Sequence, residues 1–127
     1  MKKFIFTLLF STLVFSSPSY ADWTKTTGNV SGDNFYVDFD RIRKHDGYVY
    51  YWRLTDYLKP TEYGDLSFKG YMQGDCKLFR FKKLSASYYT NSMCNGTPSN
   101  SDSIQTKWYY PSPNSANEVI LNSVCSH

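Results

Sequence analysis

Short runs in which apolar and polar side chains alternate fill most of the chain after residue 21, and turn-forming residues separate them. Alternation with a period of two is the pattern of half-buried β-strands. Runs that follow one another this closely favour antiparallel pairing through hairpins. The pattern therefore predicts an α+β fold, mainly antiparallel, whose meander-type sheet has six strands: 22–27, 35–39 with a continuation at 42–43, 48–57, 66–72, 75–89 and 104–110.

Two of these runs are expected to lie in the middle of the sheet. Residues 48–57 carry apolar side chains on both faces, which indicates a strand covered on both sides. The Asp46-Gly47 pair before them predicts a tight hairpin turn, and 73–75 predicts another before the long run 75–89. Within 75–89 the apolar positions change face near Lys82 and Lys83, which indicates a bulge or bend.

Beyond the loop-like composition of 91–103, the periodicity changes near the C-terminus. Ser115 and Glu118 have the spacing of a capping box, in which the hydroxyl accepts an amide hydrogen and the carboxylate reaches back. Ile120, Leu121, Val124 and Cys125 then fall on one flank of a helix. One short C-terminal helix is therefore expected to close the sheet, in a single domain that spans 22–127.

The first 21 residues have the three parts of a secretory signal peptide: a basic start, an apolar run over 4–15 and small residues before Ala21. Cleavage after Ala21 would place Asp22 first, so no acylated cysteine is expected, and no later run is long enough to span a membrane. The expected location is periplasmic, secreted or surface-associated, without a lipid anchor. Loss of Lys2 and Lys3 lowers the net charge from +3 to +1, which argues against a nucleic-acid binder.

Three cysteines, Cys76, Cys94 and Cys125, predict one disulfide and one free thiol in an exported protein. Loop-closure entropy does not separate the three pairings. An extended strand after Cys76 would hold it far from Cys94. A short terminal helix also needs to be docked, so the expected bridge joins Cys76 to Cys125.

Candidate catalytic groups are few. His45 lies at a predicted turn and His127 is far along the chain, so no histidine pair has the spacing of metal ligands. Asp38 and Asp40 could form an acid pair or a calcium rim, although such residues more often bond nearby amides. Cys94 lacks a histidine partner. We therefore expect no enzyme activity, no metal and no cofactor.

A basic cluster is the strongest candidate binding feature, because its charges interleave with Phe79 and Phe81. It could bind a sulfated glycan or an acidic segment of a protein, whereas the plainer interpretation is a strand face kept soluble by charge. Tyrosines also suit contact surfaces, a second copy of the chain included. The cluster consists of Lys77, Arg80, Lys82 and Lys83.

A series of short motifs, in order, covers the chain from about Trp23 to Cys125: Tyr36-Val37-Asp38, Trp52-Arg53-Leu54 with Asp56-Tyr57, Asp75-Cys76, Gly96, Trp108-Tyr109-Tyr110, Pro111 with Pro113, and Val124-Cys125. In these motifs the sequence resembles the surface-adhesin protein E family of exported bacterial proteins. The resemblance implies an antiparallel sheet with a C-terminal helix held by a disulfide, at Cys76 and Cys125 here. It also implies a virulence role through binding of host extracellular-matrix proteins such as vitronectin and laminin. The alternative is a periplasmic envelope domain with an unknown ligand and no adhesive role.

Overall fold

The computed structural model describes residues 21–127, so the predicted signal peptide, apart from Ala21, lies outside the described residues. Within this part, seven strands form one sheet: β1 (Thr24–Gly28), β2 (Asn34–Val37), β3 (Arg43–His45), β4 (Tyr48–Asp56), β5 (Ser67–Asp75), β6 (Arg80–Tyr89) and β7 (Asn100–Asp102). Two 3₁₀ helices, η1 (Phe39–Arg41) and η2 (Ser92–Cys94), and one α-helix, α2 (Ala116–Cys125), complete it. None of the helices among these residues has the length and apolar character that a bilayer crossing requires.

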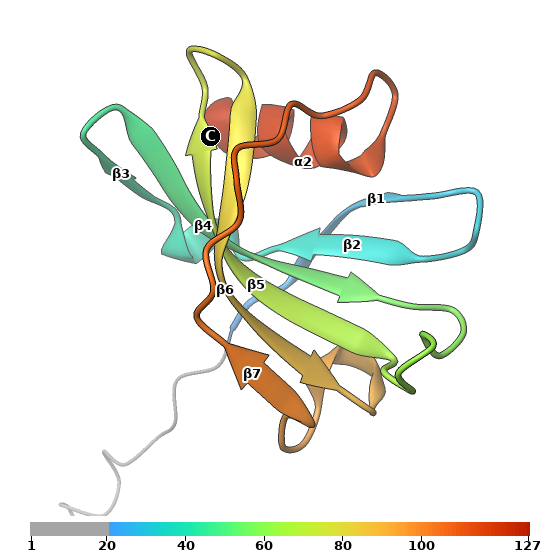
Figure 1. Cartoon of the computed structure of the whole chain (residues 1–127). Coiled ribbons are helices and arrows are strands. Elements are labelled where there is room, and N and C mark those ends of the chain that lie inside the picture. The colour runs from blue at the N-terminus through green and yellow to red at the C-terminus, as the bar shows by residue number, and fades with distance from the viewer. Residues whose placement is uncertain (1–20) are drawn as a thin grey trace, which may run out of the picture.

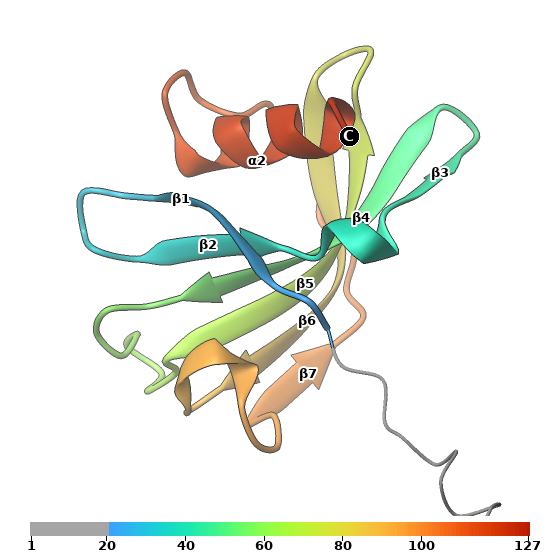
Figure 2. The same cartoon turned by 180° about the vertical axis from the view of Figure 1, so that it is seen from behind.

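The sheet is antiparallel throughout and confirms the predicted fold class. Its order is β1-β2-β4-β5-β6-β7, and β3 pairs with β4 beside β2. The strand β4 is central, as the sequence predicts, because β2 and β3 pair with it on one side and β5 on the other. Figures 1 and 2 show α2 lying over one face of the sheet, next to β1, β2 and the β5–β6 hairpin.

The main core lies between α2 and this face, which we call the inner face. Three residues of α2, Ile120, Leu121 and Val124, are buried against strand residues that include Val37, Val49, Tyr51, Met72 and Phe81. The helix begins as predicted, since Ser115 Oγ accepts a hydrogen bond from the amide of Glu118 at 3.2 Å. The carboxylate of Glu118 reaches back one residue further than expected and accepts from the amide of Asn114 at 3.1 Å.

The predicted bulge and hairpin turn are confirmed. Asp46 and Gly47 have positive φ angles, 51° and 81°, and join β3 to β4 as a two-residue loop. Met72 pairs with Lys83 while the preceding Tyr71 pairs with Ser85, so β6 has one extra residue at Leu84. This bulge changes which face each later residue of β6 presents.

The predicted long strand 75–89 begins too early, and the turn at 73–75 is wrong. Residue 75 ends β5, the turn occupies 76–79, and β6 starts at Arg80. Asp75 holds this turn, because its Oδ1 accepts from the amide of Leu78 at 3.1 Å, while Phe79 has a φ of 53°. Gly74 stays in the strand because a Cβ there would lie 2.8 Å from Val49 and 3.0 Å from Leu121, so the glycine permits close packing beneath α2.

Two other predicted segments differ from the structure. The short β7 lies within 91–103, which was expected to be a loop. The expected strand 104–110 forms no regular ladder with β6, but only an isolated bridge at Tyr109 and a hydrogen bond from the amide of Thr106 to the carbonyl of Lys83 at 3.0 Å. The hydroxyl of Thr106 accepts from the amide of Lys83 at 2.9 Å, which replaces a regular ladder bond. Upstream, η1 interrupts the expected continuation at 42–43, and β3 begins separately.

The predicted disulfide is confirmed. Cys76, in the β5–β6 turn, is bonded to Cys125 at the end of α2, and their Cα atoms are 5.7 Å apart. Cys94 is free and half-buried in η2. The bridge therefore fixes the end of the helix to the hairpin over which it lies.

Candidate functional site

The face of the sheet opposite α2, which we call the outer face, carries a row of half-buried aromatic side chains. Tyr50 and Trp52 are two residues apart on β4 and therefore share a face. The ring of Tyr71, from β5, lies 4.7 Å from the ring of Trp52 and 6.3 Å from that of Tyr50, measured between centroids. Lys69 adds a cation, with Nζ 5.7 Å from the ring of Trp52. These four residues form a continuous surface that solvent reaches.

Trp108 joins the outer face because of the bridge between Phe81 and Tyr109. The two residues exchange backbone hydrogen bonds of 2.9 and 2.8 Å. Neighbouring residues along extended chain point to opposite faces, so this bridge places Trp108 beside Lys82 on the outer face.

Trp108 is contacted by two cations and one aromatic ring. The Cζ of Arg80 lies 4.3 Å from its ring centroid, and the Nζ of Lys82 lies at 4.9 Å. The ring of Tyr48 stacks against it at 5.7 Å. We call Tyr48, Arg80, Lys82 and Trp108 the Trp108 patch. Both cations are within the distance at which cation–π attraction orders a side chain.

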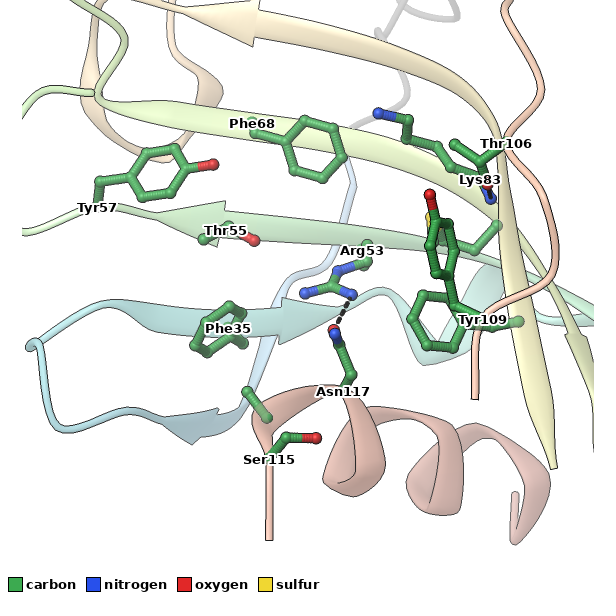
Figure 3. Close-up of a pocket in the computed structure, with 13 residues that line it drawn as sticks. Phe35, Arg53, Thr55, Tyr57, Phe68, Lys83, Thr106, Tyr109, Ser115 and Asn117 are labelled. Carbon is green, nitrogen blue, oxygen red and sulfur yellow. Dashed lines mark hydrogen bonds between the residues drawn. The ribbon is translucent and has the colours of Figure 1, made fainter. Parts of the chain in front are cut away.

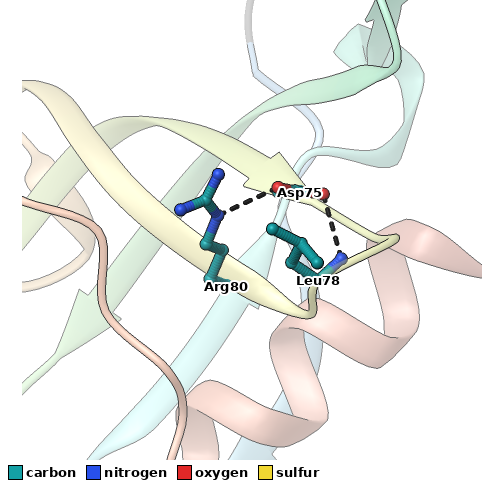
Figure 4. Close-up of polar contacts among 3 residues, drawn as sticks. All are labelled: Asp75, Leu78 and Arg80. Carbon is teal, nitrogen blue, oxygen red and sulfur yellow. Dashed lines mark hydrogen bonds and ion pairs between the residues drawn. The ribbon is translucent and has the colours of Figure 1, made fainter.

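Arg80 is held in place by Asp75, as Figure 4 shows. Its Nε lies 2.9 Å from Oδ2 of Asp75, while Oδ1 of the same carboxylate accepts from Leu78. Burial by itself would raise the pKa of Asp75, but the hydrogen bonds from Leu78 and Arg80 and the charge of Arg80 outweigh it, so the pKa is lowered. Asp75 thus stays ionised and neutralises part of the Arg80 charge. The salt bridges among residues 21–127 do not include Lys82, which supplies the uncompensated charge of the patch.

The four basic residues named from the sequence do not form one patch. Arg80 and Lys82 share the outer face, whereas Lys77 is exposed in the turn. Lys83 lies on the inner face, where its Nζ is 5.4 Å from the ring of Phe68 and 3.4 Å from the hydroxyl of Tyr88. The bulge at Leu84 comes after Lys83 and so does not bring it to the outer face.

The sequence hypothesis missed the residue at the centre of the patch. Trp108 belongs to the aromatic triplet Trp108-Tyr109-Tyr110, which is one of the motifs that carry the family resemblance. Nothing in the sequence pattern links this triplet to the basic residues of β6. The sequence hypothesis also missed Arg53, a lone charge between Trp52 and Leu54 in a strand that is otherwise largely apolar. That isolation is a sequence signal for a buried charge.

The acidic residues considered for catalysis or calcium have other surroundings. Asp38 is buried, and its Oδ2 lies 3.3 Å from Nε of Arg41 and 3.4 Å from the backbone nitrogen of Asp22. Asp40 is exposed on η1. Across residues 21–127, no three His, Cys, Asp or Glu side chains are grouped so that they could hold a metal ion.

Comparison with known proteins identifies the family. The family model described as "Surface-adhesin protein E" matches residues 23–126. A crystal structure of Haemophilus influenzae protein E has the same fold, with a TM-score of 0.63 and 13% sequence identity, covering 86% of this chain and 91% of that one. No curated protein matches the sequence. The family is one of adhesins and not of enzymes. From Trp23 to Ser126, this chain belongs to the surface-adhesin protein E family.

Proposed function

We propose that this domain is an exported adhesion module that binds a host extracellular-matrix protein through its outer face. The observation that carries the proposal is the Trp108 patch, in which a half-buried indole holds two cations on a sheet face that α2 leaves uncovered. Family membership supports an adhesin-type module at an exported or surface location. The nature of the partner is inferred from the patch.

The patch combines the residue types that supply most binding energy at protein interfaces. Tryptophan, tyrosine and arginine are enriched among residues whose loss costs the most affinity. The contacts with Asp75 and Trp108 hold Arg80 before binding, so less side-chain entropy is lost when a partner arrives. Lys82, without an acidic partner in the described part of the chain, would attract a carboxylate or a sulfate.

The neighbouring aromatic row extends this contact surface. Tyr50, Trp52 and Tyr71 present large, rigid side chains that solvent reaches, and such rings suit both protein and sugar surfaces. A partner that covers the row and the patch would meet an aromatic centre with cations at two places, Lys69 and the Arg80–Lys82 pair. This chemistry fits an acidic segment of a matrix protein, and a sulfated glycan attached to the matrix is the second ligand class to test.

Binding of residues 22–127 to immobilised vitronectin, laminin and heparin tests the proposal. Replacing Trp108 with Leu should weaken matrix-protein binding about tenfold or more, the scale of losing one central anchor. Lys82→Gln should weaken binding less and reduce its salt dependence. The control is Lys59→Gln, which makes the same charge change in an exposed loop away from the patch. Binding that is unchanged in Trp108→Leu, or absent from wild type, would reject the proposal.

Cellular location separates adhesion from the periplasmic alternative. Antibody labelling or protease shaving of intact cells should reach an adhesin. Release only after disruption of the outer membrane would favour an envelope domain with no adhesive role.

A further inference from the structure

A pocket of about 480 Å³ lies on the inner face, between the sheet and the first turn of α2 (Figure 3). Its volume is within the range of sites that bind small molecules. Most of its wall is apolar or aromatic, formed by Phe35, Phe68, Met72, Phe81 and Tyr109. It lies on the face opposite the Trp108 patch and shares no residue with it.

One charged side chain, Arg53, is built into this wall. Only 7% of Arg53 is exposed, and its Nη1 donates to Oδ1 of Asn117, on α2, at 2.7 Å. Its Cζ lies 5.6 Å from the ring centroid of Phe35. Figure 3 shows the guanidinium in the middle of the lining residues, between the sheet and the helix.

This charge is not balanced inside the domain. The Nε of Arg53 is buried without a hydrogen-bond partner, and the salt bridges among residues 21–127 do not include Arg53. Neither Asp nor Glu occurs among the residues that line the pocket. A buried cation without a counter-charge opposes folding, so an anion that enters from outside the chain would stabilise the domain.

Two further features favour a negative group at this place. Ser115, Ala116 and Asn117 line the pocket, so the first turn of α2, which is the positive end of the helix dipole, borders it. Lys83 lines it from β6, where its ammonium group is placed by Tyr88 and Phe68. A single guanidinium with one nearby lysine suits a monoanion. A carboxylate fits such a place because its oxygens accept charge-assisted hydrogen bonds from N–H groups.

We infer that this pocket binds a small amphipathic carboxylic acid, with the carboxylate beside the Arg53 guanidinium, which lines the pocket, and the apolar body between Phe35, Phe68 and Phe81. Such a carboxylate would supply the counter-charge that the Arg53 guanidinium lacks among residues 21–127. The same chemistry occurs in a free acid and at the C-terminal end of a peptide. The volume of the pocket limits either source to roughly one ring system or one side chain.

Isothermal titration of residues 22–127 with matched acids and amides tests this inference. The probes are 2-naphthoate against 2-naphthamide for a free acid, and N-acetylphenylalanine against its amide for a peptide end. We expect an acid to bind about tenfold or more tightly than its neutral amide, because only the acid pairs with Arg53. If only N-acetylphenylalanine shows this preference, the pocket binds a chain end; if only naphthoate shows it, the pocket binds a free acid.

Variants locate the preference at the pocket. Arg53→Met keeps much of the volume and removes the unpaired charge, so it should fold and should lose the preference for acid over amide. Lys83→Met should reduce the preference for acid over amide several-fold. This variant tests the inference if Arg53→Met does not fold. Lys77→Met is the matched control, because Lys77 is exposed in the β5–β6 turn and does not line the pocket, and it should bind like wild type. Equal affinity for acid and amide, no binding of any probe, or a preference that survives in both pocket variants would overturn the inference.

Discussion

The backbone nitrogen of Asp22 lies 3.4 Å from Oδ2 of Asp38, a buried carboxylate whose Oδ1 has no hydrogen-bond partner among the described residues. Asp22 is the residue at which the mature chain is predicted to begin. Cleavage after Ala21 would convert this amide into an ammonium group with three donors, next to an acceptor that is not fully used. The free energy of unfolding should therefore depend on the residue at which the mature chain begins.

A chain that begins at Asp22 should be more stable than one with an additional N-terminal residue, by about 1–2 kcal/mol, because a charged donor then reaches Asp38. Chemical denaturation of the two forms measures the difference. In Asp38→Asn the two forms should have equal stability, because the carboxylate is gone. A difference of the same size in that background would show that Asp38 is not the partner.

Loss of the disulfide should destabilise the domain by about 2–5 kcal/mol, the range for a small exported domain. In Cys125→Ser, hydrogen exchange should increase most in α2, which would no longer be tied to the β5–β6 turn. Cys94→Ser is the matched control and should retain protection of α2, because Cys94 is free. Equal exchange in α2 of both variants would mean that packing alone holds the helix.

The Asp75–Arg80 contact should make stability depend on pH in the acid range. Hydrogen bonds to Leu78 and Arg80 lower the pKa of Asp75 in the folded state despite its burial, so ionised Asp75 favours folding. Its contribution is complete above the unfolded value of about 3.9 and is lost as the pH falls through the lower folded pKa. Asp75→Asn should therefore be less stable than wild type at neutral pH, and the two should converge in acid. Asp40→Asn, which removes a carboxylate at an exposed position, is the matched control.

The closeness of α2 to the sheet at Gly74 should make Gly74→Ala destabilising by about 1–3 kcal/mol, the usual cost of overpacking a core. A Cβ at this position would be 2.8 Å from Cγ1 of Val49 and 3.0 Å from Cδ1 of Leu121. Leu121→Val in the same chain makes room beside the new methyl group and should recover part of the loss. Denaturant unfolding of the single and double variants measures both effects. Additive losses would show that Leu121 is not the obstacle.

The thiol of Cys94 should react slowly at neutral pH. Burial raises its pKa, an effect that the hydrogen bond with Ser67 and the charge of Lys69 oppose and that Asp56 reinforces. Less thiolate is therefore present near neutrality than for a free cysteine. Alkylation by iodoacetamide, followed by mass spectrometry, should be slower than that of glutathione and should rise with pH beyond the ordinary value of about 8.5. A rate equal to that of glutathione at neutral pH would contradict this expectation.

Local signals in the sequence were sufficient for much of the fold. The Asp46-Gly47 turn and the Ser115–Glu118 cap depend on residues close together in sequence, and both are present. Gly74 was misinterpreted because its role comes from Leu121 on α2, far away in sequence. The expected strand 104–110 failed because a side-chain hydroxyl, that of Thr106, takes the place of a backbone acceptor.

The site was less accessible from sequence, because pairing between distant segments creates it. The basic residues are neighbours along β6, yet strand alternation separates Lys82 from Lys83 onto opposite faces. Trp108 reaches Lys82 only through the bridge of Phe81 to Tyr109. Arg53 lacks a counter-charge because of all the elements that pack around it, and these come from distant parts of the sequence. A local sequence pattern therefore does not predict this feature.

The tryptophans and the tyrosines of the domain give two separate fluorescence signals. Trp52 and Trp108 both belong to the outer face, and Trp23 lines a hollow together with Lys69, whereas the Arg53 pocket is lined by tyrosine and phenylalanine and has no indole in its wall. Arg80 and Lys82 lie close enough to Trp108 for their charges to shift its emission. A partner that displaces them should therefore change the wavelength of maximum tryptophan emission. A ligand in the pocket should leave this emission nearly unchanged while it alters the tyrosine signal. Intrinsic fluorescence can therefore tell, without any label, which of the two faces a ligand occupies.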